Sequence, residues 1–248
     1  VRDLTAIENG PTRHCNNLGS YNYLGFGGPN EHTTPEMIES IKRSGVTISS
    51  TPVELGISKE QRELEVAMAK YIGKEDAIVV PMGFATNSMV LPALAGRGSL
   101  ILSDSLNHAS IITGLRLSGA VLRKFEHADI NKLEMGLREA TAEQPAWKRI
   151  LVCVEGIYSM EGEICPLPEV VRLCKKYGAL LYVDEAHSIG ALGPHGRGVC
   201  DYWGIDPKDV DILMGTFTKS FGSVGGYISG DHKTVNMLRH TALAAVYG

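Results

Sequence analysis

Short runs of consecutive apolar residues alternate with amphipathic segments through most of the 248-residue chain. A strand that is apolar throughout must be buried on both faces, which is typical of parallel sheets covered by helices. The helices between such strands form right-handed crossovers. The sequence therefore predicts an α/β fold with a mostly parallel sheet flanked by helices. Its strands are expected at residues 77–80, 99–103, 120–122, 150–154, 179–183 and 210–214.

Capping residues and the 3.6-residue period indicate the helices. Thr34 is the expected N-cap of a first helix, with Pro35 at its first position and Gly45 after its end. Asp129 is the expected N-cap of a later one. A second helix, ended by a glycine, should bury one stripe consisting of Leu64, Ala67, Met68, Tyr71 and Ile72. Further helices are expected at 87–95, 108–117 and 167–177.

Composition excludes several classes of protein. The net charge is −4 and no stretch concentrates lysine and arginine, so we expect no nucleic-acid partner. The longest uncharged run, 77–96, is interrupted by Pro81 and Pro92, so no membrane span is expected in this chain. The cysteine count is odd and lacks C-x-x-C spacing, which favours reduced thiols at Cys15, Cys153, Cys165, Cys174 and Cys200.

Polar residues follow several of the predicted strands, at the sheet edge where α/β proteins bind ligands. Gly83 and Phe84 open a helix, where backbone N–H groups can face an anion, although a plain turn explains them equally well. His108 follows the second strand, and a helix cap or surface histidine is its simpler explanation. Asp184 and His187 follow a very apolar strand, which favours a shared ligand over a solvated turn.

Lys219 follows the apolar segment 210–214 and sits between Phe217 and Phe221, not among other charges. A lysine amine is nucleophilic only when neutral, and a desolvated setting lowers its pKa towards that state. The hydroxyl of Thr216 lies on the same loop, where it can bind a phosphate. Because lysines are mostly exposed, an ordinary surface lysine is the alternative.

Together these strand ends offer an anion site, a histidine able to stack on a ring, a carboxylate beside a histidine, and a lysine. Pyridoxal phosphate (PLP) needs such a set, because its aldehyde binds a lysine and its ring nitrogen needs a carboxylate to stay protonated. We therefore expect PLP as the cofactor. No metal site is expected, since the histidines and acids lack ligand spacing. The glycines at 222–226 also lack the G-x-G-x-x-G spacing of a dinucleotide site.

Three segments carry a resemblance to the α-oxoamine synthase family of PLP enzymes: 154–162 (VEGIYSMEG), 183–194 (VDEAHSIGALGP) and 215–222 (GTFTKSFG). The match runs from about Leu18 to the end. The TFTK sequence is most similar to the serine palmitoyltransferase branch, and its lysine to the catalytic rather than the non-catalytic subunit of that branch. The resemblance implies the large domain of a fold type I, aspartate aminotransferase-like PLP-dependent transferase.

The resemblance also implies roles for single residues. Lys219 would bind the cofactor covalently and later take the substrate α-proton. Asp184 would hold the protonated ring nitrogen, and His108 would stack on the ring. His187 would bond the phenolic oxygen, with Ser159 nearby.

Other residues would bind the phosphate and the substrate. By the same resemblance, Gly83 and Phe84 would offer backbone groups to the phosphate side and Thr216 would bind the phosphate itself. Asn22 matches a position near the substrate carboxylate.

The implied reaction is the decarboxylative condensation of L-serine with palmitoyl-CoA to 3-oxosphinganine, CO2 and CoA, the first step of sphingolipid biosynthesis. A homologous non-catalytic subunit is the implied partner, and the cytosolic face of the endoplasmic reticulum membrane is the implied location. A truncated, inactive chain that docks on a partner is one alternative. Another PLP enzyme, such as an aldolase or a different α-oxoamine synthase, is the other.

We expect residues 1–45 to form an entry segment and 46–248 the PLP-binding large domain. The family's C-terminal small domain and amino-terminal membrane anchor would lie outside this chain. Two positions depart from the family pattern: Pro52 stands where an arginine is usual, and Gln61 where a histidine is usual. We expect diverged local contacts there, not lost catalysis.

Overall fold

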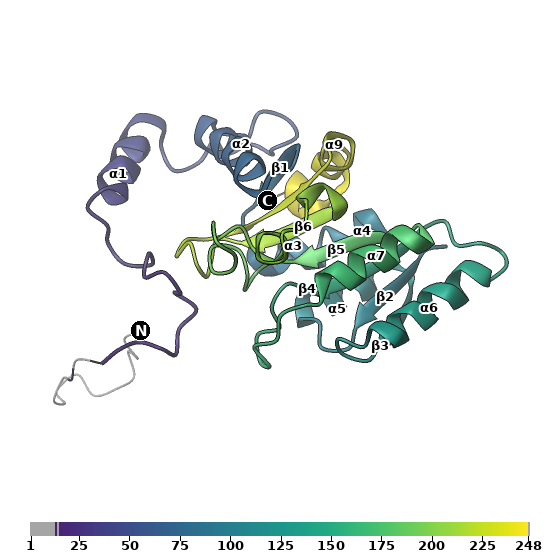
Figure 1. Ribbon diagram of the computed structural model, residues 1–248. Coiled ribbons are helices and arrows are strands. Elements are labelled where there is room, and N and C mark those ends of the chain that lie inside the picture. The colour runs from purple at the N-terminus through teal and green to yellow at the C-terminus, as the bar shows by residue number, and fades with distance from the viewer. Residues whose placement is uncertain (1–12, 14, 248) are drawn as a thin grey trace.

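A computed structural model describes residues 13 and 15–247 (Figure 1). Within them a seven-stranded sheet has the order β1-β7-β6-β5-β4-β2-β3. The pairs β2/β3, β2/β4, β4/β5 and β5/β6 are parallel, and β7 runs antiparallel to β1 and β6. The predicted, mostly parallel sheet is confirmed. Its strands are β1 Asp76–Val80, β2 Leu100–Asp104, β3 Val121–Phe125, β4 Ile150–Glu155, β5 Leu180–Asp184, β6 Ile212–Thr216 and β7 Gly226–Gly230.

Helices cover both faces of this sheet. Alternate strand residues point to opposite faces, so Leu100 and Leu102 join one core while Ile101 joins the other. Buried residues of α2, α6, α7 and α8 complete the first core, and those of α4, α5, α9 and α10 complete the second. The helices are α1 Thr33–Ser44, α2 Lys59–Ile72, α3 Gly83–Ser88, α4 Leu91–Leu94, α5 Ala109–Ser118, α6 Ile130–Ala142, α7 Leu167–Tyr177, α8 Val199–Trp203, α9 His232–Thr241 and α10 Leu243–Val246, with a 3-10 turn at Pro207–Asp209.

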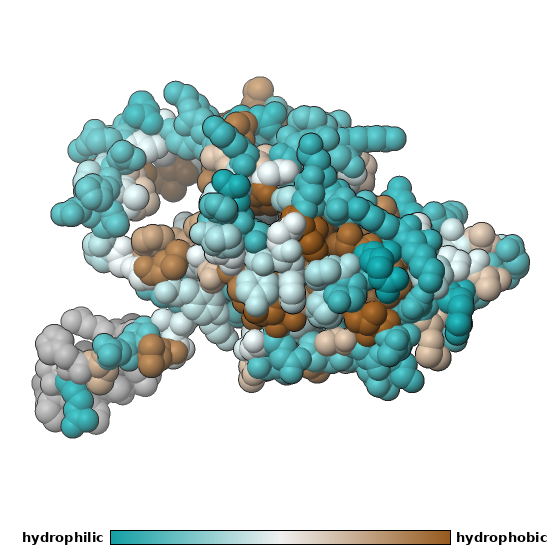
Figure 2. Space-filling model, in the orientation of Figure 1, coloured by the Kyte–Doolittle hydropathy of each residue, from teal (hydrophilic) through white to brown (hydrophobic). Residues whose placement is uncertain are grey.

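The segment that carries α1 stands apart from the body of the molecule (Figure 1). No residue of α1 is buried, and its apolar side chains Met37, Ile38 and Ile41 are exposed. Apolar side chains are visible along this segment in the space-filling view (Figure 2). The predicted cap is wrong, because α1 begins one residue before Thr34, whose hydroxyl instead accepts from the backbone N–H of Asn30.

The predicted helix 87–95 is two short helices, α3 and α4. Pro92 explains the break, since it lacks the N–H that a continuous helix would donate to the carbonyl of Ser88, and its ring would clash there. The predicted face of α2 is also partly wrong. Met68 and Ile72 are buried as expected, but Leu64 and Ala67 are exposed, and Glu65 and Ala69 are buried in their place.

Other local predictions are confirmed. Asp129 accepts from the backbone N–H of Lys132 at the start of α6, and α7 occupies the predicted 167–177. All five cysteines are free thiols, with Cys15 exposed and the others buried. Among the described residues, none of the helices has the length and hydropathy needed to cross a membrane.

Candidate active site

Three neighbouring strands end at one edge of the sheet, and each ends in a polar residue. Glu155 ends β4, Asp184 ends β5 and Thr216 ends β6. Glu155 lies opposite Asp184 in the parallel pairing of β4 with β5, and Asp184 lies opposite Met214 of β6. The carboxyl ends of parallel strands share an edge, so the loops after them meet there, as predicted.

Lys219 lies in the loop after β6, with its amine turned towards the loop after β5. Its Nζ is 2.8 Å from Nε2 of His187 and 5.6 Å from the centre of the Tyr21 ring. On its other side His187 lies with Nδ1 2.7 Å from the hydroxyl of Tyr23. The amine is therefore half-buried among side chains, and the alternative of an ordinary surface lysine is wrong.

The surroundings favour the neutral forms of both Lys219 and His187. Burial lowers the pKa of Lys219, although Asp184 and Glu155 oppose this shift. Burial, with repulsion from Lys219 and His108, lowers the pKa of His187 to about 4. When Lys219 is an ammonium it can only donate, so the neutral His187 accepts at Nε2 and donates from Nδ1 to Tyr23.

The carboxylate of Asp184 is buried and oriented from two sides. Its Oδ2 accepts from Nδ2 of Asn87 at 2.7 Å, and its Oδ1 accepts from the backbone N–H of Ala186 at 2.8 Å. Asn87 comes from α3, so the helix after β1 and the strand β5 meet at this carboxylate. The two hydrogen bonds hold Asp184 in one orientation.

Glu155 is a second buried carboxyl beside Asp184. Burial, together with the nearby charge of Asp184, raises the pKa of Glu155 to about 8. One of its oxygens accepts the backbone N–H of His108, which is the N-cap of α5. The capping explanation for His108 is thus confirmed, and the same contact places its ring at the strand ends.

Thr216 and Gly83 face each other on the other side of the site. The Thr216 hydroxyl donates to the carbonyl of Gly225 at 2.9 Å and lies 2.8 Å from the hydroxyl of Thr218. A Cβ atom at Gly83 would lie only 2.9 Å from Thr216 Oγ1. Phe84 is exposed and packs edge-on against the His108 ring, with 6.4 Å between ring centres.

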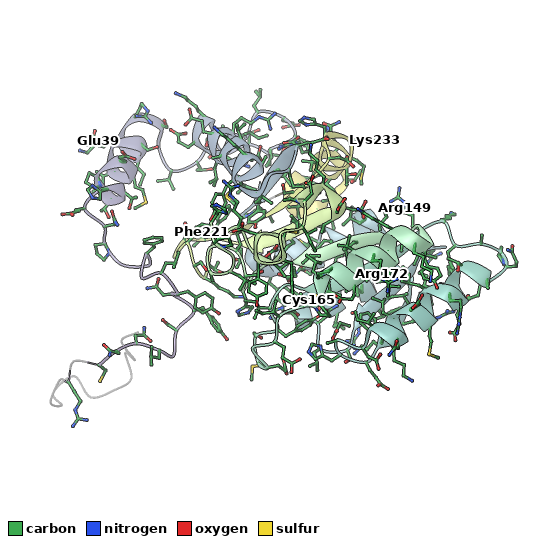
Figure 3. The ribbon with its side chains drawn as sticks, viewed as in Figure 1. Glu39, Arg149, Cys165, Arg172, Phe221 and Lys233 are labelled. Atoms are coloured by element: carbon green, nitrogen blue, oxygen red, sulfur yellow. The ribbon has the colours of Figure 1, made fainter. Side chains whose placement is uncertain are left out.

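Two candidate residues, Ser159 and Asn22, take no part in the contacts described above. Ser159 is exposed in the turn after β4. Asn22 accepts the backbone N–H of Gly27 at 3.0 Å, so its side chain closes a local turn. That turn does approach the site, because a Cβ at Gly222 would collide with the backbone nitrogen of Gly27. Phe221 lies on the side of the body that faces this segment (Figure 3).

Sequence reasoning missed several residues that contact the candidates. Asn87, Glu155, Tyr21, Tyr23 and Ser110 all touch Lys219, Asp184, His187 or His108, directly or through one neighbour. Only Glu155 had a usable signal, since it directly follows an apolar strand. Among the residues described, no group of three or more histidines, cysteines and acids is arranged to hold a metal ion.

Nearly the whole length of this chain is similar to known proteins. The chain is 55% identical over 241 residues to "Long chain base biosynthesis protein 2b" of Arabidopsis thaliana, which covers 95% of this chain and 49% of that protein. It is 52% identical over 246 residues to "Serine palmitoyltransferase 2" of Dictyostelium discoideum, which covers 97% of this chain and 50% of that protein. The chain thus spans about half the length of the curated relatives it matches.

Solved structures have the same fold. One described as "high resolution structure of SPT with PLP internal aldimine" is 33% identical, with a TM-score of 0.86 over 93% of this chain and 56% of that one. A Sphingomonas wittichii serine palmitoyltransferase is 35% identical, with a TM-score of 0.86 over the same shares. The predicted fold class is confirmed. The sequence model for aminotransferase class I and II matches residues 13–246, and the chain belongs to that family.

Proposed function

We propose that this chain is the cofactor-binding part of a PLP-dependent serine C-palmitoyltransferase. The reaction joins L-serine and a long-chain acyl-CoA into 3-oxosphinganine, with release of CO2 and CoA. One observation carries the proposal: the amine of Lys219 lies 2.8 Å from His187 at the sheet edge where Asp184 ends the neighbouring strand. The names of the relatives and of the solved structures support the same reaction.

The residues of the site fit PLP. The glycine at position 83 leaves space beside the Thr216 hydroxyl that a Cβ would fill, which suits a phosphate against the backbone N–H groups of Gly83 and Phe84. Asp184 supplies the carboxylate for the ring nitrogen, His108 a ring to stack on it, and Lys219 the amine. When bound, PLP stabilises the negative charge left on the α-carbon of serine after its proton is removed.

The side chains of the site have two tasks, which are to transfer the α-proton of serine and to hold the reacting groups in position. Burial lowers the pKa of Lys219 and so favours the neutral amine, the form in which Nζ can accept the α-proton of serine. His187 stays neutral and, with Tyr23 fixing its ring, presents one defined nitrogen to the site. Tyr21 and Tyr23 of the entry segment lie against Lys219 and His187 and help to orient them.

The cofactor test uses purified chain and PLP. The unmutated chain should give the absorption band of lysine-bound PLP, and Lys219→Ala should remove it. Lys233→Ala is the matched control, because that lysine is exposed on α9, away from the site (Figure 3). Absence of the band in the unmutated chain, or its persistence in Lys219→Ala, contradicts the cofactor assignment.

The reaction test uses carboxyl-labelled serine. Labelled CO2 should be released only when acyl-CoA is present, because the condensation precedes loss of the carboxylate. Release without acyl-CoA would indicate another kind of PLP enzyme. Asp184→Asn should keep the fold and lose this activity, since a neutral amide cannot hold the ring nitrogen protonated. Full activity in Asp184→Asn would contradict the role of Asp184.

We propose further that residues 46–248 form the cofactor domain and that a homologous non-catalytic subunit is the partner, at the endoplasmic reticulum membrane. The exposed apolar side chains of α1 and the entry segment support a protein partner over a bare surface. Co-expression with the homologous subunit, followed by co-purification of Ile38→Asp and of unmutated chain, tests the partner. If Ile38→Asp co-purifies with the homologous subunit as well as the unmutated chain does, the exposed apolar side chains of α1 are not the contact surface.

A further inference from the structure

Asn87 uses every hydrogen-bonding group of its side chain inside the protein. It is 1% exposed. Its Oδ1 accepts from the hydroxyl of Tyr182 at 2.6 Å, and its Nδ2 donates to Asp184 at 2.7 Å and to the Ser110 hydroxyl at 2.9 Å. A tyrosine hydroxyl and a carboxylate on opposite sides fix which end of the amide is oxygen and which is nitrogen. The orientation of Asn87 is therefore determined by its neighbours.

The same chain of donors fixes the proton of His108. The Ser110 oxygen accepts from Asn87, so its single hydrogen is free to donate to Nδ1 of His108, 2.7 Å away. The backbone N–H of Ser110 also donates to that nitrogen, at 3.2 Å. Two donors on Nδ1 leave the ring proton of neutral His108 on Nε2.

We propose that Asn87 is a positioning residue that couples Asp184 to His108. One N–H of its amide orients the carboxylate of Asp184, and the other, through Ser110, holds His108 with its proton on Nε2. A side chain on α3 thus sets the geometry of two groups, one in the loop after β2 and one at the end of β5. The expected effect on cofactor binding rests on the proposed function, whereas the expected tautomer of His108 does not depend on it.

The first experiment measures that tautomer directly. The whole chain, labelled with ¹⁵N-histidine, is examined by NMR at alkaline pH, because only a neutral imidazole has a tautomer to measure. The His108 signals are assigned by their loss in His108→Gln. In the unmutated chain we expect one protonated nitrogen, Nε2, and one unprotonated nitrogen, Nδ1. A proton on Nδ1 overturns the proposal.

Variants then test the coupling. Asn87→Asp keeps the shape, but its carboxyl group has at most one proton and cannot donate to both Asp184 and Ser110. With an acceptor oxygen facing it, the Ser110 hydroxyl should turn to the new carboxyl group, and the two His108 nitrogen signals should move towards each other. Ser110→Ala should move the same signals, and it keeps the proposal testable if Asn87→Asp fails to fold. Unchanged His108 signals in either folded variant overturn the proposal.

Asn107 provides the matched control. It is also a buried asparagine at the strand ends, but its Nδ2 donates to Ser103 and to the carbonyl of Cys153. Asn107→Ala should leave the His108 signals unchanged. If it moves them as much as Asn87→Asp does, a general loss of packing explains both results and the coupling is refuted.

The second readout is equilibrium binding of PLP. Asn87→Asp should weaken binding roughly ten-fold or more, the size expected for a lost hydrogen bond to a charged group. Ser110→Ala should weaken it less, because it spares Asp184, and Asn107→Ala should not weaken it. Equal affinity in Asn87→Asp and unmutated chain overturns the role towards the cofactor. Failure of the unmutated chain to bind PLP refutes the proposed function instead, while the His108 spectra still decide the coupling.

Discussion

His187 carries its low pKa because it is buried between Lys219 and Tyr23. An unfolded histidine titrates near pH 6.5, and folded His187 titrates at about 4. Between these values the unfolded chain binds more protons, so acid favours unfolding. Below pH 6.5 the stability of the chain should therefore fall because of this residue.

We expect His187→Gln to remove this dependence. As the pH falls from 6.5 to 4, the unfolding free energy of the unmutated chain should drop by roughly 2–3 kcal/mol more than that of the variant. Denaturant titrations at several pH values measure the difference. His32→Gln, at an exposed histidine, is the control and should keep the original slope. Parallel slopes for His187→Gln and the unmutated chain would show that His187 is not held neutral.

Glu155 should have the opposite pH dependence. Its pKa is raised from an ordinary value near 4.5 to about 8, so the folded chain keeps a proton that the unfolded chain loses. Stability from this group is present below pH 4.5 and lost as the pH rises to 8. Glu155→Gln can still accept from His108, so it should be more stable than the unmutated chain at pH 8, by roughly 4 kcal/mol.

The measurement for Glu155 is again unfolding by denaturant, at pH 5 and pH 8. Glu161→Gln is the control, since Glu161 is exposed in the loop that follows β4. A gain in stability that is the same at both pH values would mean that the change acts through packing and not through the proton of Glu155.

At the scale of elements, α2 is held to the sheet by a charged residue in its buried stripe. Glu65 accepts from Arg239 of α9 at 2.8 Å and from the backbone N–H of Val79 in β1 at 3.1 Å. Its side chain is 2% exposed. Arg239 continues the contact to Asp76 at 3.2 Å. The ion pair of Glu65 and Arg239 is buried and joins α2, β1 and α9.

Removing Glu65 takes one carboxylate partner from the buried guanidinium of Arg239 and the acceptor from the backbone N–H of Val79, while Asp76 still contacts Arg239. We therefore expect Glu65→Ala to lower the free energy of unfolding by about 3–5 kcal/mol. Glu63→Ala, on the exposed side of the same helix, should change it by less than about 1 kcal/mol. Thermal or denaturant unfolding of both variants makes the comparison. Similar losses would place Glu65 on the surface, contrary to the structure.

At the scale of the whole molecule, the segment with α1 and the sheet body differ in how much they bury. No residue of α1 is buried, whereas β2, β6 and β7 are buried at every position. Backbone with few buried contacts is cut first by proteases. Limited proteolysis should cleave between residues 45 and 58 and leave a resistant product that contains the whole sheet.

Mass spectrometry of the products tests this expectation. Digestion in the presence of a second, homologous subunit should protect the 45–58 region if that subunit covers it. Early cleavage within the sheet or in α5, α6 or α7 would contradict the division into an exposed segment and a packed body.

Local patterns determined much of the fold. Apolar runs gave six strands to within a few residues, because burial on both faces leaves little freedom in residue type. β7 was missed, since Gly226–Gly230 contains two glycines and becomes a strand only by pairing with β1 and β6. The stripe of α2 was misjudged, because Glu65 is stabilised inside by Arg62 of the same helix and by Arg239, far away in the chain.

The sequence by itself placed Lys219, Asp184 and His187 at one edge, because parallel strands must end together and each residue lies at a strand end or within a few residues after it. Only the tertiary structure brought Asn87 to Asp184, Tyr23 to His187 and Glu155 to His108. These contacts join residues 47 to 164 positions apart. No local period or spacing encodes them, since a hydrogen bond between loops depends on how the helices pack across the sheet.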